Sequence, residues 1–320
     1  MFKWKKLGQV FNPANIKNKS WIHEYAQAPS VLIFDTYIRV YFSCRPKPDE
    51  RGQYVSYSAY VDVNRKNLFE ILNVSKEPIL KLGELGTFDE FGTYPVSVIR
   101  NDDKICAYYT GHTRCESVPF NTAIGLAISN NNGETFDKTG SGPVLSYTLN
   151  EPFTLSGPKI RKFNNVWYLW YIAGMKWIVT DDKPELIYRI RMASSHNGID
   201  WIKLDKNIIE DKLGENEVQA SPDVFFYEGI YHMFFCYMQT PDFRKNKDKT
   251  YRIGYAFSID LVNWTRDDSK AGIDISEEGW DSEMVAYPHV FELDGNIYMF
   301  YLGNQVGKHG FGLAQLEKDA

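Results

Sequence analysis

The segment GWDSEMVAYPHVFELDGNIYMFYLGN, residues 279–304, decides the fold of this chain because its pattern recurs along the sequence. It consists of a proline, a short apolar strand, a polar turn at Asp294-Gly295 and a strand rich in aromatic residues. The same order appears in AQAPSVLIFDTYIRVYFS, GTYPVSVIRNDDKICAYYTG, LSGPKIRKFNNVWYLWYIAG and QASPDVFFYEGIYHMFFCY. The five prolines are Pro29, Pro95, Pro158, Pro222 and Pro288, so the repeat period lies between 63 and 66 residues. Self-similarity at a fixed period indicates a repeat architecture.

A second pair of strands follows in the same units. TAIGLAISNNNGETF, YRIRMASSHNGIDW and YRIGYAFSIDLVNW each give an alternating strand, a turn of Asn, Asp or Gly, and a closing aromatic residue at Phe136, Trp201 or Trp264. Such alternation bounded by turn residues is typical of β-hairpins, and YVSYSAYVDVNRKNLF is a diverged first copy. Four strands in each unit predict the blade of a β-propeller. We therefore expect an all-β protein, a five-bladed β-propeller with four-stranded antiparallel blades.

Five blades must close into a ring, because an open end would leave an unpaired sheet edge. The last unit has a third strand, HGFGLAQL, but the chain ends at Ala320 without a fourth. WKKL at residues 4–7 resembles WIKL at residues 201–204, which begins a fourth strand. We expect residues 3–11 to complete the fifth blade. Residues 1–320 would then form a single domain whose blades start near residues 24, 90, 153, 217 and 283.

The composition excludes several classes of partner. The net charge is -5 and no basic block is present, which argues against nucleic acid as a partner. The N-terminal MFKWKKLGQVFNP has no apolar run behind its charges, so we expect neither a signal peptide nor insertion into a membrane. Cys44, Cys106, Cys115 and Cys236 lack the spacing of metal ligands and predict reduced thiols in a cytoplasmic protein. The sequence does not indicate an oligomeric state.

Acidic residues recur just before the prolines. Counting back five positions gives Glu24, Glu90, Phe153, Glu217 and Glu283, and Asp89 and Asp281 lie close by. In one interpretation each Glu ties down its own blade by bonding to backbone amides. In the other the carboxylates converge, and their repulsion separates their pKa values as glycosidic acid–base chemistry requires. The candidate catalytic residues are Glu283, Asp281, Glu90 and Asp89, with blade five strongest because it adds Trp280, Tyr287 and His289.

Cationic residues form a second group. Arg45 ends the second strand of blade one, and TGHTR places His112 and Arg114 at the equivalent point of blade two. Arginine favours planar anionic partners, so these residues predict a sugar acid, a sugar phosphate or a nucleotide-sugar as ligand; the alternative is surface arginines paired with nearby acids. The candidate ligand-binding residues are Glu24, Arg45, His112, Arg114, Trp177, Glu217, Asp223, Trp280, Tyr287, His289 and Asn304. No metal ligand or cofactor is assigned, although a channel ringed by carboxylates could hold a cation.

These segments resemble a known superfamily. The five-unit arrangement is similar, over essentially the whole chain, to the five-bladed propellers of glycoside hydrolase families 43, 32, 68 and 130. VPFNTAIGLAISNNNGETF, YRIGYAFSIDLVNW and residues 279–304 also resemble bacterial glycosyl-hydrolase-like proteins and the propeller-like region of plant glucosamine inositolphosphorylceramide transferases. Families 43 and 32 carry catalytic acids at three positions that are Ala28, Tyr94 and Ser156 here. The resemblance implies a carbohydrate-active propeller without that triad.

Three hypotheses about function follow from these observations. The first is an enzyme that cleaves or transfers a glycosyl unit, in glycan or surface-polysaccharide metabolism. The second is a glycosyltransferase or phosphorylase that uses an activated, anionic sugar donor, as family 130 and related mannosyltransferases imply. The third is a sugar-binding propeller without chemistry.

Overall fold

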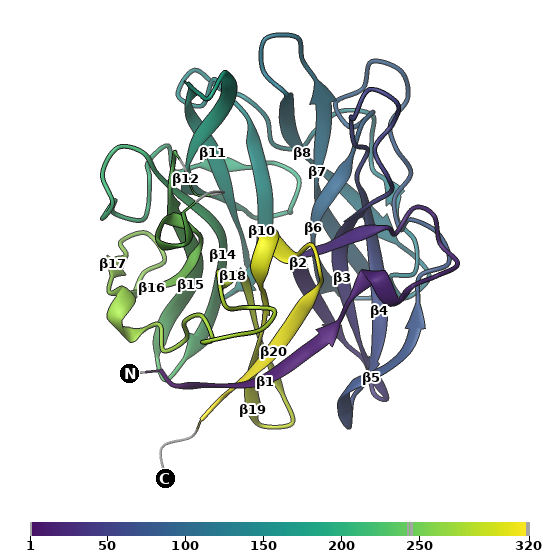
Figure 1. The fold of residues 1–320 in the computed structure, drawn as a ribbon, viewed down its shortest axis with the longest axis vertical. Helices are drawn as coiled ribbons and strands as arrows, with labels where there is room; N and C mark the ends of the chain where they lie inside the picture. The colour runs from purple at the N-terminus through teal and green to yellow at the C-terminus, as the bar shows by residue number, and fades with distance from the viewer. Residues whose placement is uncertain (1, 242, 244–245, 318–320) are drawn as a thin grey trace.

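The computed structural model describes residues 2–241, 243 and 246–317, which form five four-stranded antiparallel sheets (Figure 1). Blade one contains β2 (Glu24–Ile33), β3 (Tyr37–Arg45), β4 (Tyr57–Asn64) and β5 (Asn67–Val74), and blade two contains β6 (Thr93–Asn101), β7 (Lys104–Arg114), β8 (Phe120–Ser129) and β9 (Asp137–Lys138). Blade three contains β10 (Leu155–Phe163), β11 (Val166–Thr180), β12 (Lys183–Ser195) and β13 (Ile202–Lys203). Blade four contains β14 (Glu217–Tyr227), β15 (Ile230–Gln239), β16 (Arg252–Ser258) and β17 (Thr265–Arg266), and blade five contains β18 (Ala286–Leu293), β19 (Asn296–Leu302), β20 (Phe311–Leu316) and β1 (Trp4–Phe11). The predicted five-bladed propeller is confirmed.

The N-terminal strand closes the ring in blade five, as predicted. β1 pairs antiparallel with β20, from Trp4 opposite Leu316 to Phe11 opposite Phe311. Figure 1 shows this directly, since the purple β1 lies along the yellow β20. Trp4 is buried and its ring lies 5.4 Å from that of Phe234 in blade four. The strand therefore covers an edge and also packs against a neighbouring blade.

Helical segments in the described part of the chain are short. They are η1 (Pro13–Asn15), η2 (Lys247–Lys249), η3 (Asp268–Lys270) and α1 (Asn304–Gly307). In α1 the φ angles of Gln305 and Val306 are 56° and 55°, so this segment is a left-handed turn. It joins β19 to β20, and Val306 O accepts a hydrogen bond from Gln27 Nε2 of blade one at 2.6 Å.

The repeated proline marks an irregularity in the first strand of every blade. The pairing of the first and second strands changes register at this point, for example between Ala220 and Asp223 and between Ala286 and His289. The residue before the proline has a positive φ angle in blades one, three, four and five, as at Ser221 and Tyr287. Proline has no N–H to donate, so a bulge in the hydrogen-bond ladder accommodates it.

Polar side chains just after the prolines connect the first strands of adjacent blades around the central channel. The contacts are Val98 N to Ser30 Oγ (3.1 Å), Ile160 N to Ser97 Oγ (3.1 Å), Arg161 Nε to Val224 O (2.9 Å), Val290 N to Asp223 Oδ2 (2.5 Å) and Val31 N to His289 Nε2 (3.1 Å). Each blade thus bonds to the next, and the circle closes between blades five and one. Because buried backbone donors need partners, these side chains stabilise the blade order.

Candidate functional site

Two predicted ligand-binding residues, Asp223 and His289, lie inside this channel. Both are buried, and His289 Nδ1 lies 3.6 Å from Asp223 Oδ1 and 3.5 Å from Lys159 Nζ. Burial lowers the pKa of His289 to about 4 and that of Lys159 to about 8. Burial opposes ionisation of Asp223, but Arg161 at 2.7 Å and the other cations outweigh it and lower the pKa of this carboxyl. Both residues make contacts between neighbouring blades, Asp223 to Val290 of blade five and His289 to Val31 of blade one.

The remaining candidates gather at one end of the propeller, which we call the proximal face. Here the first strand of each blade begins and the second ends, as the pairs Glu24–Arg45 and Glu217–Gln239 show. The opposite end, where the first strands finish, is the distal face.

Asp89 and Asp281, two of the predicted catalytic residues, are buried in matching contacts. Asp89 Oδ2 accepts a hydrogen bond from Tyr109 Oη at 2.8 Å and lies 2.5 Å from Lys138 Nζ. Asp281 Oδ2 accepts from Tyr301 Oη at 3.0 Å and from Lys6 Nζ at 2.7 Å. In both blades the tyrosine comes from the second strand and the lysine from the fourth. These contacts favour a role in tying the blade together.

Blade three contains a third copy of this arrangement that the sequence analysis missed. Glu151 is buried, accepts a hydrogen bond from Tyr171 Oη at 2.9 Å and pairs with Lys203 of β13. Glu151 stands two residues before Phe153, as Asp281 stands two residues before Glu283. Glu151 could therefore have been found in the sequence, because it lies two residues before the position that was compared among the blades.

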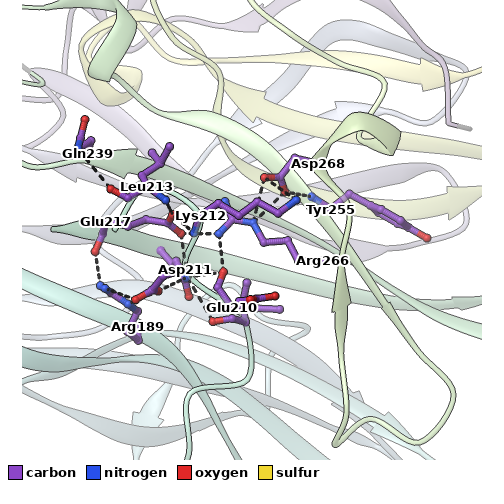
Figure 2. Close-up of polar contacts among 12 residues, drawn as sticks. Arg189, Glu210, Asp211, Lys212, Leu213, Glu217, Gln239, Tyr255, Arg266 and Asp268 are labelled. Atoms are coloured by element: carbon purple, nitrogen blue, oxygen red, sulfur yellow. Dashed lines mark hydrogen bonds and ion pairs between the residues drawn. The ribbon is translucent and has the colours of Figure 1, made fainter. Parts of the chain in front are cut away.

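Glu217 is the buried anchor of blade four (Figure 2). Its Oε1 lies 2.6 Å from Arg266 Nη1, and both side chains have an exposed fraction of 0%. Its Oε2 accepts the backbone N–H groups of Lys212 at 2.8 Å and Leu213 at 2.7 Å. Figure 2 shows Arg189 and Asp211 beside this centre. Glu217 bonds to backbone amides, as the architectural interpretation of the repeated Glu requires.

Three predicted carboxylates remain partly exposed at the proximal face. Glu90 Oε2 accepts a hydrogen bond from Gly86 N at 2.9 Å. Glu24 Oε2 lies 3.6 Å from Lys308 Nζ, and Glu283 Oε1 lies 3.1 Å from Lys247 Nζ. The Glu283 side chain is 39% exposed and that of Glu24 is 16% exposed, so Glu283 is the more accessible of these two paired carboxylates.

Asn304 and Trp280 support blade five from within. Asn304 Oδ1 accepts the backbone N–H of Glu283 at 2.8 Å, which fixes the loop that carries this carboxylate. The ring of Trp280 lies 5.1 Å from that of Tyr301 and covers the backbone at Gly303 and Gly312 so closely that a Cβ at either glycine would clash with it. These contacts favour positioning and packing roles for the two residues.

Arg45 is the candidate whose environment best suits an anion. Its guanidinium is half-buried, and Nη2 donates to Tyr94 Oη at 2.6 Å and Nε to Ser56 Oγ at 3.1 Å. It also lies 5.0 Å from the ring of Tyr25 and 5.3 Å from the ring of Tyr54. Within the part of the chain that the structure describes, Arg45 forms no ion pair. Arg114 differs, because it lies 3.7 Å from Asp49 and 4.3 Å from the ring of Phe91.

Tyrosines from the other blades lie near Arg45. Tyr188 and Tyr251 share a hydrogen bond between their hydroxyls, and the ring of Tyr251 lies 6.0 Å from that of Tyr287. Burial raises the pKa of Tyr287 well above its ordinary value; Tyr188 and Tyr94 add to this rise, and Arg45 opposes it. We call Arg45, Tyr94, Tyr188, Tyr251 and Tyr287 the tyrosine–arginine cluster, to which each blade contributes one residue. Tyr94, Tyr188 and Tyr251 were not among the predicted ligand-binding residues, although Tyr188 and Tyr251 both begin a repeated Tyr-Arg-Ile, in blades three and four.

His112 and Trp177 extend the cluster along blades two and three. The His112 ring stacks on Tyr94 with centroids 4.5 Å apart, and Phe120 lies 5.8 Å from His112 and 5.6 Å from Trp177. Burial lowers the pKa of His112 to about 4, so the imidazole is neutral at pH 7. Its Nε2 lies 2.9 Å from Tyr94 O and therefore carries the proton.

No group of three or more His, Cys, Asp or Glu that could hold a metal ion occurs among residues 2–241, 243 and 246–317. Over the same residues, no helix is long and apolar enough to cross a membrane.

Comparison with known proteins places the chain in a family. No protein-family model matches it. The proteins MT1551 and Rv1502 of Mycobacterium tuberculosis, strains CDC 1551 / Oshkosh and ATCC 25618 / H37Rv, are each 34% identical over 314 residues, which covers 98% of this chain and 99% of each relative. The chain belongs to their family. Both relatives are described as uncharacterized proteins.

Several solved structures have a fold similar to that of this chain. A glycoside hydrolase matches with a TM-score of 0.75 and 17% identity, covering 100% of this chain and 93% of the other. The β-1,2-mannobiose phosphorylase of Listeria innocua matches with a TM-score of 0.69 and 11% identity, covering 98% and 96%. A thermostable family-43 glycoside hydrolase matches with a TM-score of 0.63 and 15% identity, covering 94% and 90%. The fold is that of the five-bladed glycoside hydrolase propellers, as the sequence resemblance implied.

Proposed function

We propose that this protein is a carbohydrate-active enzyme that binds an anionic glycosyl donor at the proximal face and transfers its glycosyl unit. The observation that carries the proposal is Arg45, a half-buried guanidinium that forms no ion pair with the described residues and lies among tyrosines. A phosphate or carboxylate can bond to such a group in bidentate fashion. The tyrosine rings and hydroxyls of the cluster offer stacking faces and polar contacts to a sugar.

The residues at the three positions of the family-43 acids favour transfer over hydrolysis by that triad. Hydrolysis of a glycoside uses two carboxyl groups, one of which protonates the leaving oxygen. Asp89, Asp281 and Glu217 are buried in tethers, and Ala28, Tyr94 and Ser156 occupy the positions of the family-43 acids. A phosphate leaving group needs no such acid, because it departs as an anion that a cation can stabilise.

Each group in the proposed step has one task. The bond between the anomeric carbon and the phosphate oxygen breaks, and the phosphate leaves with the electron pair beside Arg45. The acceptor hydroxyl oxygen bonds to the anomeric carbon, and its proton passes to a carboxylate. Glu283 is the first candidate for this base because it is accessible, and Glu24 is the second.

A donor screen tests the proposal. The protein is incubated with UDP-, GDP- and CMP-sugars and with sugar 1-phosphates, with and without acceptor sugars, and products are followed by mass spectrometry. Transfer from one of these donors that is lost in Glu283→Gln supports the assignment. Release of free sugar from neutral glycosides by water alone would contradict it.

Sugar binding without chemistry is the second candidate function. It is favoured by the tethering of Asp89, Asp281 and Glu217, which removes three of the predicted carboxylates from reach. Tight binding of a glycosyl phosphate with no turnover in the same screen would select it.

A further inference from the structure

The distal face contains a cavity of about 250 Å³, at the opposite end of the first strands from the proximal candidates. Its walls come from the ends of β2, β14 and β18, from the start of β19 and from Arg161 of β10. These residues follow the repeated prolines, whereas the proximal candidates precede them. The cavity is therefore a separate candidate site, and the function proposed for the proximal face assigns no role to it.

Aromatic side chains form one wall. Phe226 and Tyr227 end β14, and Phe226 is 54% exposed. The ring of Phe226 lies 4.8 Å from that of Tyr231, which limits its movement. An exposed, oriented aromatic ring provides a flat apolar surface, and the C–H face of a sugar ring fits such a surface.

Arg161 supplies a fixed donor to the same cavity. Its Nε bonds to Val224 O at 2.9 Å and its Nη2 to Asp223 Oδ1 at 2.7 Å, so the guanidinium is held in place. Its Nη1 has one contact with the described residues, 3.4 Å to Ile160 O. Because Nη1 carries two N–H groups, one is left for a ligand oxygen. Glu292, an exposed carboxylate on the rim, can accept a hydrogen bond from a ligand hydroxyl.

The charges around the cavity exclude an anion as the preferred ligand. Asp223 pairs with Arg161, and Glu292 adds a negative charge that offsets the buried Lys159 beside His289. His289, which also lines the cavity, is neutral at pH 7 because burial lowers its pKa to about 4. The lining therefore has no surplus positive charge, in contrast to the surroundings of Arg45.

We propose that the distal cavity binds one ring of a neutral saccharide, stacked on Phe226 and hydrogen-bonded to Arg161 and Glu292. This site would hold a glycan on the face opposite the tyrosine–arginine cluster. It requires no reaction at the proximal face, so the two proposals can fail separately.

The test uses methyl glycosides of glucose, mannose, galactose and N-acetylglucosamine as neutral probes, with glucose 1-phosphate as the anionic comparison. Binding is measured by saturation-transfer NMR and by isotope-labelled protein spectra. The variants are Phe226→Ala and Glu292→Gln, and the matched control is Phe69→Ala, because Phe69 is 44% exposed on the outer strand of blade one. Thermal melts establish that each variant is folded.

We expect at least one neutral glycoside to bind the wild type, Phe69→Ala and Arg45→Ala equally. Phe226→Ala should weaken that binding by about fivefold or more, in line with the loss of one stacking contact. The proposal is overturned if none of the four glycosides binds, if Phe226→Ala and Glu292→Gln both bind like the wild type, or if glucose 1-phosphate binds this cavity more tightly than methyl glucoside.

Discussion

Replacing Asp281 by Asn distinguishes a structural role of this carboxylate from a catalytic role. The Asp281 side chain is only 4% exposed and bonds to Tyr301 Oη and Lys6 Nζ. Asn keeps the size of the side chain and can still accept from Tyr301, but it removes the charge that Lys6 faces. Hydrogen bonds to charged groups contribute about 1.5–3 kcal/mol. Lys6 is 23% exposed and can turn to water, so the full cost of about 3–5 kcal/mol for an unpaired buried charge does not apply.

We therefore expect Asp281→Asn to lower the free energy of unfolding by about 2 kcal/mol. Domains of 150–250 residues lose roughly 2–4 °C in Tm for each kcal/mol, so a decrease of about 4 °C follows. Denaturant titration and calorimetry measure both quantities. The matched control is Asp294→Asn, which removes an exposed pair with Arg65 at 2.6 Å and should change the stability much less, because solvent screens this pair.

Asp89→Asn, in the equivalent contact of blade two, should behave like Asp281→Asn. The reasoning is refuted if Asp281→Asn keeps the wild-type stability while any glycosyl transfer is lost, because that combination describes a catalytic carboxylate.

Three further predictions concern closure, catalysis and pH. Deleting residues 3–11 removes β1 and exposes the edge of β20. The deletion should lower the free energy of unfolding by several kcal/mol or cause aggregation. A monomeric deletion variant with the wild-type Tm would exclude a stabilising role for this strand. Glu283→Gln should reduce turnover by about 10²–10⁴-fold and leave donor binding and Tm unchanged. Glu217→Gln, in contrast, should lower Tm because it disrupts the pair with Arg266. If Glu283→Gln has the turnover of the wild type, Glu283 is not the catalytic base. The pKa of His112 is lowered by burial from 6.5 in the unfolded chain to about 4 in the folded protein. Unfolding therefore takes up a proton between these values, and stability should fall as the pH drops through this window. His112→Gln should flatten that slope in pH-dependent denaturation, and an identical slope would show that His112 does not contribute.

The fold was predictable because its determinants are local. Each repeat carries a proline at the bulge of the first strand and turn residues between strands, so pattern and spacing specify the blades. The closing strand was predictable from the similarity between WKKL and WIKL, and β1 indeed pairs with β20.

The candidate site was less predictable because its contacts join distant segments. Nothing near Asp281 in the sequence indicates that Lys6 will neutralise it, since the two residues are 275 positions apart. Arg45 and Arg114 occupy equivalent ends of strands, yet among the described residues only Arg114 forms an ion pair, with Asp49 at 3.7 Å. Asp223 and His289 were predicted to bind ligand, whereas their contacts with the neighbouring blades were not predicted. These contacts follow a register change at the proline, which the sequence alone does not show.

The most direct test of the central claim is calorimetric titration of the wild type and Arg45→Ala with matched charged and neutral ligands. Glucose 1-phosphate and mannose 1-phosphate are each compared with the corresponding methyl glycoside, and Arg114→Ala serves as the control. We predict that Arg45→Ala weakens binding of the sugar phosphates by roughly ten- to hundredfold, the range for a charge-assisted hydrogen bond. Binding of the glycosides to Arg45→Ala should change little, and Arg114→Ala should bind the sugar phosphates much as the wild type does. Equal losses for charged and neutral ligands, or sugar phosphates that bind no more tightly than their glycosides, would contradict an anionic donor at the proximal face.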